Sequence, residues 1–242
     1  MEMITSLQNS KIKKWTALHK KKERDLQNRF LIEGDHLIQE GLKAEIVETI
    51  ITDGECPFYC KDIVQVTPQI MHKLSENVSA VHLIAVCHKP KIYPKKLERV
   101  LLLDGVQDPG NLGTLLRTAV SFSFDAIYVS EETCDLYNDK VIRSTQGALF
   151  EIPVIRTSML DVMAALKKDG FQIIATSLEE SKTMHEIPAC EKMAFVLGNE
   201  GQGVSKEVQN AADERLRIEM HGFESLNVAV AGGIVMYQYR GV

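Results

Sequence analysis

Hydrophobic and polar positions along the chain predict buried strands that are separated by helices. Beyond residue 99, short apolar runs alternate with longer stretches in which apolar residues recur at helical spacing. We expect strands at 100–105, 126–130, 152–155, 171–176, 193–197 and 214–218, and helices at 112–123, 138–148, 159–169, 205–211 and from 225 to about 239. Strands separated by helices of this length indicate a parallel sheet that is covered on both faces.

The first part of the chain carries a smaller version of the same alternation. Residues 10–28 combine many lysines with apolar positions that predict one amphipathic helix, namely Ile12, Trp15, Leu18 and Leu26. After it we expect strands at 30–32, 44–52, 63–66 and 81–86 and helices at 34–43 and 68–74. Prolines and charges at 88–99 are typical of a connecting segment. The sequence therefore predicts a domain at 1–90, a linker at 91–99 and a domain at 100–242.

Composition places the chain among ordinary globular proteins. It has 242 residues, of which 45% are hydrophobic and 25% charged. No apolar run approaches the roughly 18 residues of a membrane helix, and the N-terminus lacks the apolar stretch of a signal peptide, so we expect a cytoplasmic protein without a membrane partner. The five cysteines do not have zinc-site spacing, and we expect neither disulfides nor a metal.

Charge is distributed unevenly along the chain. The net charge of -5 argues against a protein that coats nucleic acid indiscriminately. Lysines and arginines nevertheless crowd the first thirty residues, where a local basic face could bind phosphates. A solvated helix face explains the same pattern equally well. The RNA-binding candidates are Lys11, Lys13, Lys14, Lys21, Arg24 and Arg29.

The stretch FVLGNEGQGVS at 195–205 predicts a strand, a glycine-rich turn and a helix start. Such turns usually hold phosphates. The glycine spacing, however, is not that of a dinucleotide site, and Glu200 would repel a polyphosphate. A cationic or zwitterionic ligand fits this turn better.

Two further loops follow predicted strands. Between 101 and 120, Asn111 is expected to cap a helix that also carries Arg117, although both residues have plainer interpretations as a cap and as a surface cation. Between 217 and 239, Ser225 and Asn227 begin an apolar helix that contains Gly232 and Gly233. Because glycine in a helix costs about 1 kcal/mol relative to alanine, we expect a close neighbour at this helix.

Together these loops resemble the SpoU (TrmH-like) branch of the SPOUT methyltransferases. The matching motifs are N-x-G-x-x-x-R at Asn111, Gly113 and Arg117, L-G-N-E-G-x-G at 197–203, and S-L-N-V at 225–228. The stretch NRFLIEGDHLIQEGLKA at 28–44 is similar to the RNA-binding domain that many members carry, a fold like that of certain ribosomal proteins. The resemblance implies an α/β protein: a C-terminal α/β-knot domain with a mostly parallel sheet and a trefoil knot, and a smaller N-terminal α/β domain.

The same resemblance implies a function. It is transfer of a methyl group from S-adenosyl-L-methionine to a ribose 2′-hydroxyl of RNA, expected to be ribosomal, by a homodimer. Position by position, the resemblance implies catalytic roles for Asn111, Arg117, Glu200, Ser225 and Asn227. It implies cofactor contacts for Thr176, Leu197, Gly198, Asn199, Gly201, Ile218, Met220 and Leu226. The sulfonium of S-adenosyl-L-methionine is a cation, which matches the cationic or zwitterionic ligand expected beside Glu200.

Departures from the family pattern and rival functions leave alternatives open. Ala229 and Gly232 replace a serine and an alanine of the third motif, and SENVSAVHL at 75–83 replaces a common P-Q-G turn. The alternatives are the same reaction on transfer RNA, a catalytically silent RNA-binding homologue and, with less support, a Rossmann oxidoreductase, for which the turn at 104–112 lacks the glycine fingerprint. Arg117 could act as a base, or could fix a phosphate and stabilise an alkoxide, which suits a guanidinium better.

Overall fold

The structure, a computed structural model, describes residues 2–77, 79–220 and 225–241. Its contacts divide the chain into two compact units. The first unit contains Met1–Lys91 and Asp135–Phe150, and the second contains Ile92–Cys134 and Glu151–Val242. Within the described residues, no helix is both long and apolar enough to cross a membrane.

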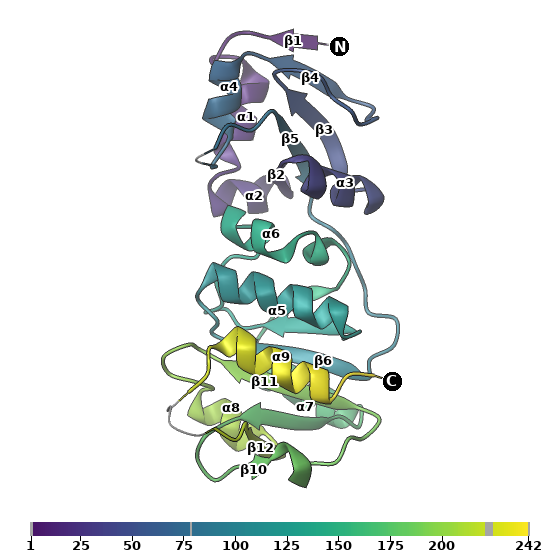
Figure 1. The fold of residues 1–242 in the computed structure, drawn as a ribbon, viewed down its shortest axis with the longest axis vertical. Helices are drawn as coiled ribbons and strands as arrows, with labels where there is room; N and C mark the ends of the chain where they lie inside the picture. Colours follow the sequence, from purple (N-terminus) through teal and green to yellow (C-terminus); the bar gives the residue numbers. More distant parts are fainter. Residues whose placement is uncertain (1, 78, 221–224, 242) are drawn as a thin grey trace. The chain divides into compact units, whose positions relative to one another are not determined.

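The first unit is built on a five-stranded mixed sheet with the order β1-β4-β3-β5-β2 (Figure 1). Strand β4 pairs in parallel with β1 and β3, whereas β5 pairs antiparallel with β3 and β2. The elements are β1 (Glu2–Ile4), α1 (Ser10–Ala17), α2 (Lys21–Gln27), β2 (Arg29–Glu33), α3 (Asp35–Lys43), β3 (Val47–Thr52), β4 (Ile63–Val66), α4 (Pro68–Leu74), β5 (Leu83–His88), α6 (Asp139–Thr145) and the 3-10 turn η1 (Ala148–Phe150).

The single helix predicted at 10–28 is wrong, because the chain turns between α1 and α2. Leu18 ends α1 and is buried, and Arg24 from α2 donates hydrogen bonds from Nη1 to the carbonyls of Leu18 (2.7 Å) and His19 (2.8 Å). These bonds satisfy carbonyls that a continuous helix would have used. The turn also moves Leu26 off the apolar face, and its side chain is 76% exposed.

Asp135–Phe150 packs into the first unit although it is distant in sequence from the rest of it. Asp135 accepts a hydrogen bond from Arg24 Nη2 at 2.5 Å, and Arg143 Nη1 donates to the Asn77 side chain at 2.5 Å. The Phe30 ring lies 4.8 Å from the ring of Tyr137, measured between centroids. The proposed domain limits of 1–90 and 100–242 are therefore not the limits of the compact units, and as functional domains they stay a prediction.

The second unit is a seven-stranded sheet with the order β10-β12-β9-β11-β6-β7-β8, and each of its pairings is parallel. Its elements are β6 (Arg99–Asp104), α5 (Pro109–Ser121), β7 (Ala126–Val129), β8 (Val154–Arg156), α7 (Met159–Lys168), β9 (Gln172–Thr176), β10 (Lys182–Thr183), the 3-10 turn η2 (Met184–Glu186), β11 (Met193–Gly198), α8 (Lys206–Ala211), β12 (Glu214–Arg217) and α9 (Val228–Gln238). The six strands predicted beyond residue 99 are confirmed, and β10 was not predicted.

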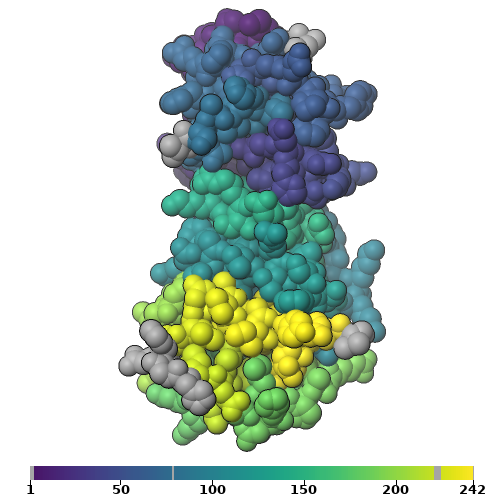
Figure 2. All heavy atoms as spheres, in the orientation of Figure 1, coloured from purple at the N-terminus to yellow at the C-terminus, as the bar shows by residue number. Residues whose placement is uncertain are grey.

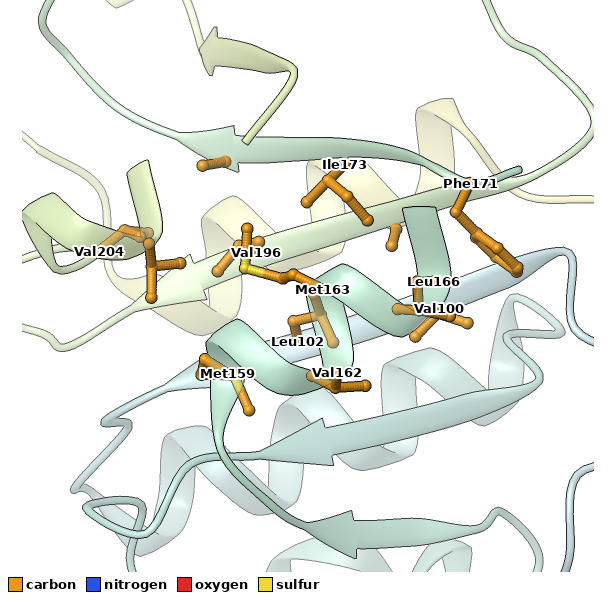
Figure 3. Packing of buried hydrophobic residues seen from close by; sticks show 13 residues of the cluster. Val100, Leu102, Met159, Val162, Met163, Leu166, Phe171, Ile173, Val196 and Val204 are labelled. Carbon is orange, nitrogen blue, oxygen red and sulfur yellow. The ribbon is translucent and has the colours of Figure 1, made fainter. Parts of the chain in front are cut away.

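Alternate residues of the central strands pack against helices on opposite faces of this sheet. On one face, Met163 and Leu166 of α7 lie against Leu102 of β6 and Val196 of β11 (Figure 3). On the other face α5 and α9 lie side by side, and the ring of Phe195 in β11 is 4.8 Å from that of Tyr239 (Figure 1). These buried layers explain why the strands read as continuous apolar runs.

The expected close approach to the last helix is confirmed at Gly232 but not at Gly233. A Cβ atom on Gly232 would lie 2.4 Å from Leu115 Cδ2 and 2.7 Å from Leu197 Cδ1, whereas one on Gly233 would meet nothing within 4 Å. Helix α9 therefore packs tightly on α5 and β11 through Gly232.

The chain also folds back closely on itself after β11. The Asn199 N–H donates to the Gly203 carbonyl at 3.0 Å, and the Gly203 N–H donates to the Asn199 carbonyl at 2.9 Å. A Cβ on Gly198 would lie 2.0 Å from the carbonyl carbon of Gly203 and 2.1 Å from the Val204 nitrogen. Because these neighbours are backbone atoms, they have little freedom to yield.

Substitution of Gly198 by alanine is expected to destabilise the protein by about 1–3 kcal/mol or more, as in other overpacked sites. The matched control is Gly201→Ala in the same loop, where the added Cβ would be 3.7 Å from its nearest neighbour, Asn199 Oδ1, an ordinary contact. Urea unfolding of both variants measures the difference. Equal stability of the two variants would contradict this account of the turn.

Candidate functional site

Three loops of the second unit converge at one edge of its sheet. Because β6 and β11 are parallel neighbours, the loops that follow them leave from the same edge. The residues that precede α9 are hydrogen bonded to the first of these loops. The three sequence motifs are therefore brought together, as their positions after strands suggested.

Glu200 connects the loop after β11 to the loop after β6. Its Oε1 accepts hydrogen bonds from the Asn111 side-chain amide (3.0 Å) and from the Asp108 N–H (3.0 Å), and its Oε2 accepts one from the Gln107 N–H (3.1 Å). Partial burial raises the pKa of the Glu200 carboxyl, but the bonds from Asn111, Asp108 and Gln107 lower it by more, so that the pKa lies below its ordinary value. Glu200 is therefore a carboxylate at neutral pH.

Asn111 also connects this pair of loops to the last helix. Its Oδ1 accepts a hydrogen bond from Asn227 Nδ2 at 2.9 Å. Asn227 caps α9, because its Oδ1 accepts from the Ala229 N–H at 2.9 Å. The prediction that Asn111 caps its own helix is wrong: Asp108 is the cap of α5, and its Oδ1 accepts from the Asn111 N–H at 2.8 Å. The Asn111 side chain is thereby free to join the other two loops.

Asn199 holds the glycine-rich turn in shape. Its Nδ2 donates to the Gly105 carbonyl at 2.9 Å, and its Oδ1 accepts from the N–H groups of Gly201 (2.9 Å) and Gln202 (3.1 Å). The side-chain amide thus makes hydrogen bonds at both ends within the protein. The residue lines the site described next, but these bonds give its side chain a structural role.

A cavity of about 420 Å³ opens beside the glycine-rich turn, a size typical of small-molecule sites. It is lined by all eight residues for which the sequence implied cofactor contacts: Thr176, Leu197, Gly198, Asn199, Gly201, Ile218, Met220 and Leu226. Glu200 and Ser225 line it as well. Asn111, Arg117 and Asn227 are not among the lining residues.

The lining suits a ligand that is both apolar and charged. The lining contains leucine, isoleucine and methionine residues, and it also contains the acidic residues Glu179 and Glu200 and the basic residues Lys206 and Arg217. S-Adenosylmethionine combines an aromatic base, a zwitterionic amino acid and a sulfonium cation, so these residues fit its chemistry. Sequence reasoning missed Glu179, Lys206 and Arg217. Only their positions beside the predicted strand ends and the glycine motif could have indicated them.

Arg117 lies apart from the hydrogen-bonded network. It is on α5, six residues after Asn111, and helical geometry turns the two side chains away from each other. Its side chain is exposed, and in the described part of the chain its guanidinium makes no hydrogen bond or ion pair. The guanidinium is therefore available to a group outside this chain.

The basic candidates of the first unit fall into two groups. Lys13, Lys14 and Lys21 are exposed, and Lys11 is half-buried. Arg29 pairs with Glu48, and Arg24 is 6% exposed with its guanidinium held by Asp135 and two carbonyls. Arg24 therefore stabilises the first unit, and we leave it out of the RNA-binding face proposed below. The part of the chain that the structure describes contains no group of three or more His, Cys, Asp or Glu residues that could hold a metal ion.

Comparison with known proteins connects this geometry to one family. Residues 98–237 match the model of the SpoU rRNA Methylase family, and residues 9–85 match that of the MRM3-like substrate binding domain. The 23S rRNA (guanosine(2553)-2′-O)-methyltransferase RlmP of Bacillus subtilis is 40% identical over 100% of both chains.

Solved structures give the same result for the fold. An AdoMet-bound rRNA methyltransferase from Sinorhizobium meliloti is 27% identical, with a TM-score of 0.86 over 98% of this chain and 96% of that one. The TrmH/SpoU tRNA modifying enzyme of A. aeolicus is 28% identical, with a TM-score of 0.53, and covers 60% of this chain and 75% of its own. The chain has the SPOUT fold and belongs to the SpoU rRNA methylase family.

Proposed function

We propose that this protein methylates the ribose 2′-hydroxyl of a guanosine in 23S ribosomal RNA. The family is S-adenosylmethionine dependent, and the observation that supports this reaction most directly is the cavity beside Glu200. Residues of the second and third family motifs line it, and Asn111 of the first motif is hydrogen bonded to Glu200 and Asn227. The choice of RNA rests on similarity to the B. subtilis enzyme over the whole chain, because the A. aeolicus tRNA modifying enzyme matches only 60% of it. We propose the guanosine that corresponds to 2553 as the target.

S-Adenosylmethionine supplies the methyl group from a sulfonium. We propose that Thr176, Leu197, Gly198, Asn199, Gly201, Ile218, Met220 and Leu226 hold it, with the ionised Glu200 stabilising its positive charge. We propose that Asn111 and Asn227 fix the relative positions of the loops and that Ser225, which is exposed at the cavity, orients the ribose. Most of the rate enhancement then comes from positioning.

Arg117 has a different role in this proposal. A guanidinium, with a pKa above about 12, is a poor base. It is a good partner for a phosphate and for the negative charge that develops on the ribose oxygen as its proton leaves. The exposed, unpaired position of Arg117 supports contact with RNA rather than with other residues of this chain.

The N-terminal domain is proposed to bind the RNA. Lys13, Lys14 and Lys21 project from α1 and α2, Lys11 lies beside them, and the match to a substrate binding domain covers this region. We propose functional domains at 1–90 and 100–242 with a linker at 91–99, which the limits of the two family matches support. We also propose that the protein works in the cytoplasm and that this methyl transfer needs no metal.

A trefoil knot and a homodimer complete the proposal. Helix α9 follows β12, near one edge of the sheet, yet packs against α5 and β11, and this return path supports threading of the C-terminal segment.

Helix α9 contains no charged residue. Its outer side exposes Val230 (51%) and Tyr237 (57%), and its atoms form part of the molecular surface in Figure 2 (yellow). Such a surface suits a second copy of the chain.

Incubation with S-adenosylmethionine and a 23S rRNA transcript, followed by mapping of ribose methylation, tests the proposed function. Methylation at the guanosine equivalent to 2553 is the expected result. Methylation of transfer RNA in its place, or binding of RNA without methylation, would contradict it.

Arg117→Lys is expected to bind both RNA and cofactor but to methylate slowly, because lysine lacks the planar fork that holds a phosphate and an alkoxide together. The single-turnover rate with saturating RNA should fall by about 100-fold, the size of effect expected for one lost electrostatic contact. A rate equal to that of the wild type would show that Arg117 lacks this role.

Glu200→Gln should lower the melting temperature at pH 7 but not at low pH. The lowered pKa of Glu200 in the folded protein means that its stabilisation is present above the unfolded pKa of about 4.3 and is lost as the pH falls through the folded value. Melting curves at pH 7 and at a series of pH values below about 4.3 measure this loss, which should grow as the pH falls. The control is Glu207→Gln on α8, for which no change is expected, and a pH-independent difference for Glu200→Gln would argue against ionisation as its cause.

The double substitution Val230→Glu and Tyr237→Glu is expected to convert a dimer into a monomer, because it places charges on the outer side of α9. Light scattering should give twice the chain mass of 27.1 kDa for the wild type and that mass for the variant. Leu160→Glu on α7, also at an exposed leucine, serves as the control. A monomeric wild type, or a dimeric variant, would disprove this interface.

A further inference from the structure

The segment that connects β5 to β6 is strongly basic. Its charged side chains are Lys89, Lys91, Lys95 and Lys96, and no acidic residue occurs between Glu76 and Glu98. In a chain with a net charge of -5, this is a local excess of positive charge. The family motifs and the basic helices described above do not include this segment.

Exposure alternates along residues 91–95. Lys91, Tyr93 and Lys95 are exposed, whereas Ile92 and Pro94 are half-buried. Proline holds the residue before it in an extended conformation, so that Pro94 favours this arrangement at Tyr93. In an extended chain, alternate side chains share one side and lie about 6.6 Å apart. Along the chain, the exposed Tyr93 ring therefore stands between two exposed cations, just before the chain bends at Lys95.

Two of the four lysines are already used within the protein. Lys89 Nζ lies 2.5 Å from Asp25 Oδ1 and 4.7 Å from the centre of the Tyr137 ring, and Lys96 pairs with Glu98. For Lys91 and Lys95, no ion pair occurs among residues 2–77, 79–220 and 225–241. Their ammonium groups are therefore the ones available to an external anion.

Tyr93 differs from the other exposed tyrosines in its surroundings. It is 78% exposed. Tyr59, 93% exposed, lies in a loop with Glu55 and Asp62, which would repel phosphates. The Tyr237 ring packs at 5.7 Å from that of Phe122. Only at Tyr93, among the tyrosines of the described chain that are exposed, do lysines flank the ring closely on both sides.

We propose that Lys91, Tyr93 and Lys95 form an RNA-binding row, in which an unpaired base of the substrate stacks on the Tyr93 ring while the two lysines contact the flanking phosphates. Stacking on an aromatic ring with cations beside it is the usual way in which proteins hold unpaired nucleotides. The inference rests on the proposed function, because it takes the substrate to be RNA. It adds a third contact region to the basic helices and the catalytic loops.

Binding of a 23S rRNA transcript to the full-length protein, measured over a range of salt concentrations, tests this row. Tyr93→Ala should weaken binding roughly 5- to 150-fold, the range for loss of one stacked base, while Tyr93→Phe should bind like the wild type. Lys91→Gln with Lys95→Gln should reduce the salt slope of log K by about 1.4, since each phosphate contact with a single strand contributes about 0.7. Tyr59→Ala and Lys168→Gln are the matched controls, with no expected change. All variants should bind S-adenosylmethionine like the wild type.

The proposal would be contradicted if the Tyr93→Ala and lysine variants kept the wild-type affinity and salt slope. It would also be contradicted if the control variants lost as much RNA affinity as these variants. Because the readout is binding, its failure is distinct from failure of the proposed function. A wild-type protein that binds the transcript without methylating it contradicts the proposed reaction alone. A wild type that does not bind RNA contradicts both.

Discussion

The site depends on one carboxylate and the amide beside it. Glu200 accepts hydrogen bonds from Asn111, Asp108 and Gln107, and this joins the loops after β6 and β11. The Asn111 amide donates to Glu200 through Nδ2 and accepts from Asn227 through Oδ1, which adds the start of α9. A side chain that both donates and accepts at its tip is needed here, and an amide has this property.

The rest of the site is arranged around this connection. The parallel sheet brings the loops to one edge, and Gly232 lets α9 lie close to α5 and β11 so that Asn227 reaches Asn111. The hydrogen bonds that join the loops also keep the pKa of Glu200 low, so the charge is fixed before a ligand arrives. Such preorganised charge is more effective than charge that must reorient during the reaction.

Much of the fold could be predicted because its signals are local. The central strands β6, β9 and β11 of the second unit are largely buried and read as apolar runs, and the three motifs mark loops at strand ends. What sequence reasoning missed depends on contacts distant along the chain. Arg24 is buried by Asp135, 111 residues away, and the turn near it exposes Leu26. Asp108 and Asn111 are both of residue types that commonly cap helices. The residues around 108–111 alone do not show that the Asn111 side chain instead donates a hydrogen bond to Glu200, 89 residues later in the chain.

The central claim is that hydrogen bonds outside the cavity hold together the loops that line it. Calorimetric titration of S-adenosylmethionine into Asn111→Ala, Asn227→Ala and the double variant tests it most directly, because neither residue lines the cavity. The account predicts that each single variant binds more weakly than the wild type, and that the two losses are non-additive by about 0.5–3 kcal/mol, as for residues in direct contact. Unchanged affinity in Asn111→Ala, or strictly additive losses, would contradict it.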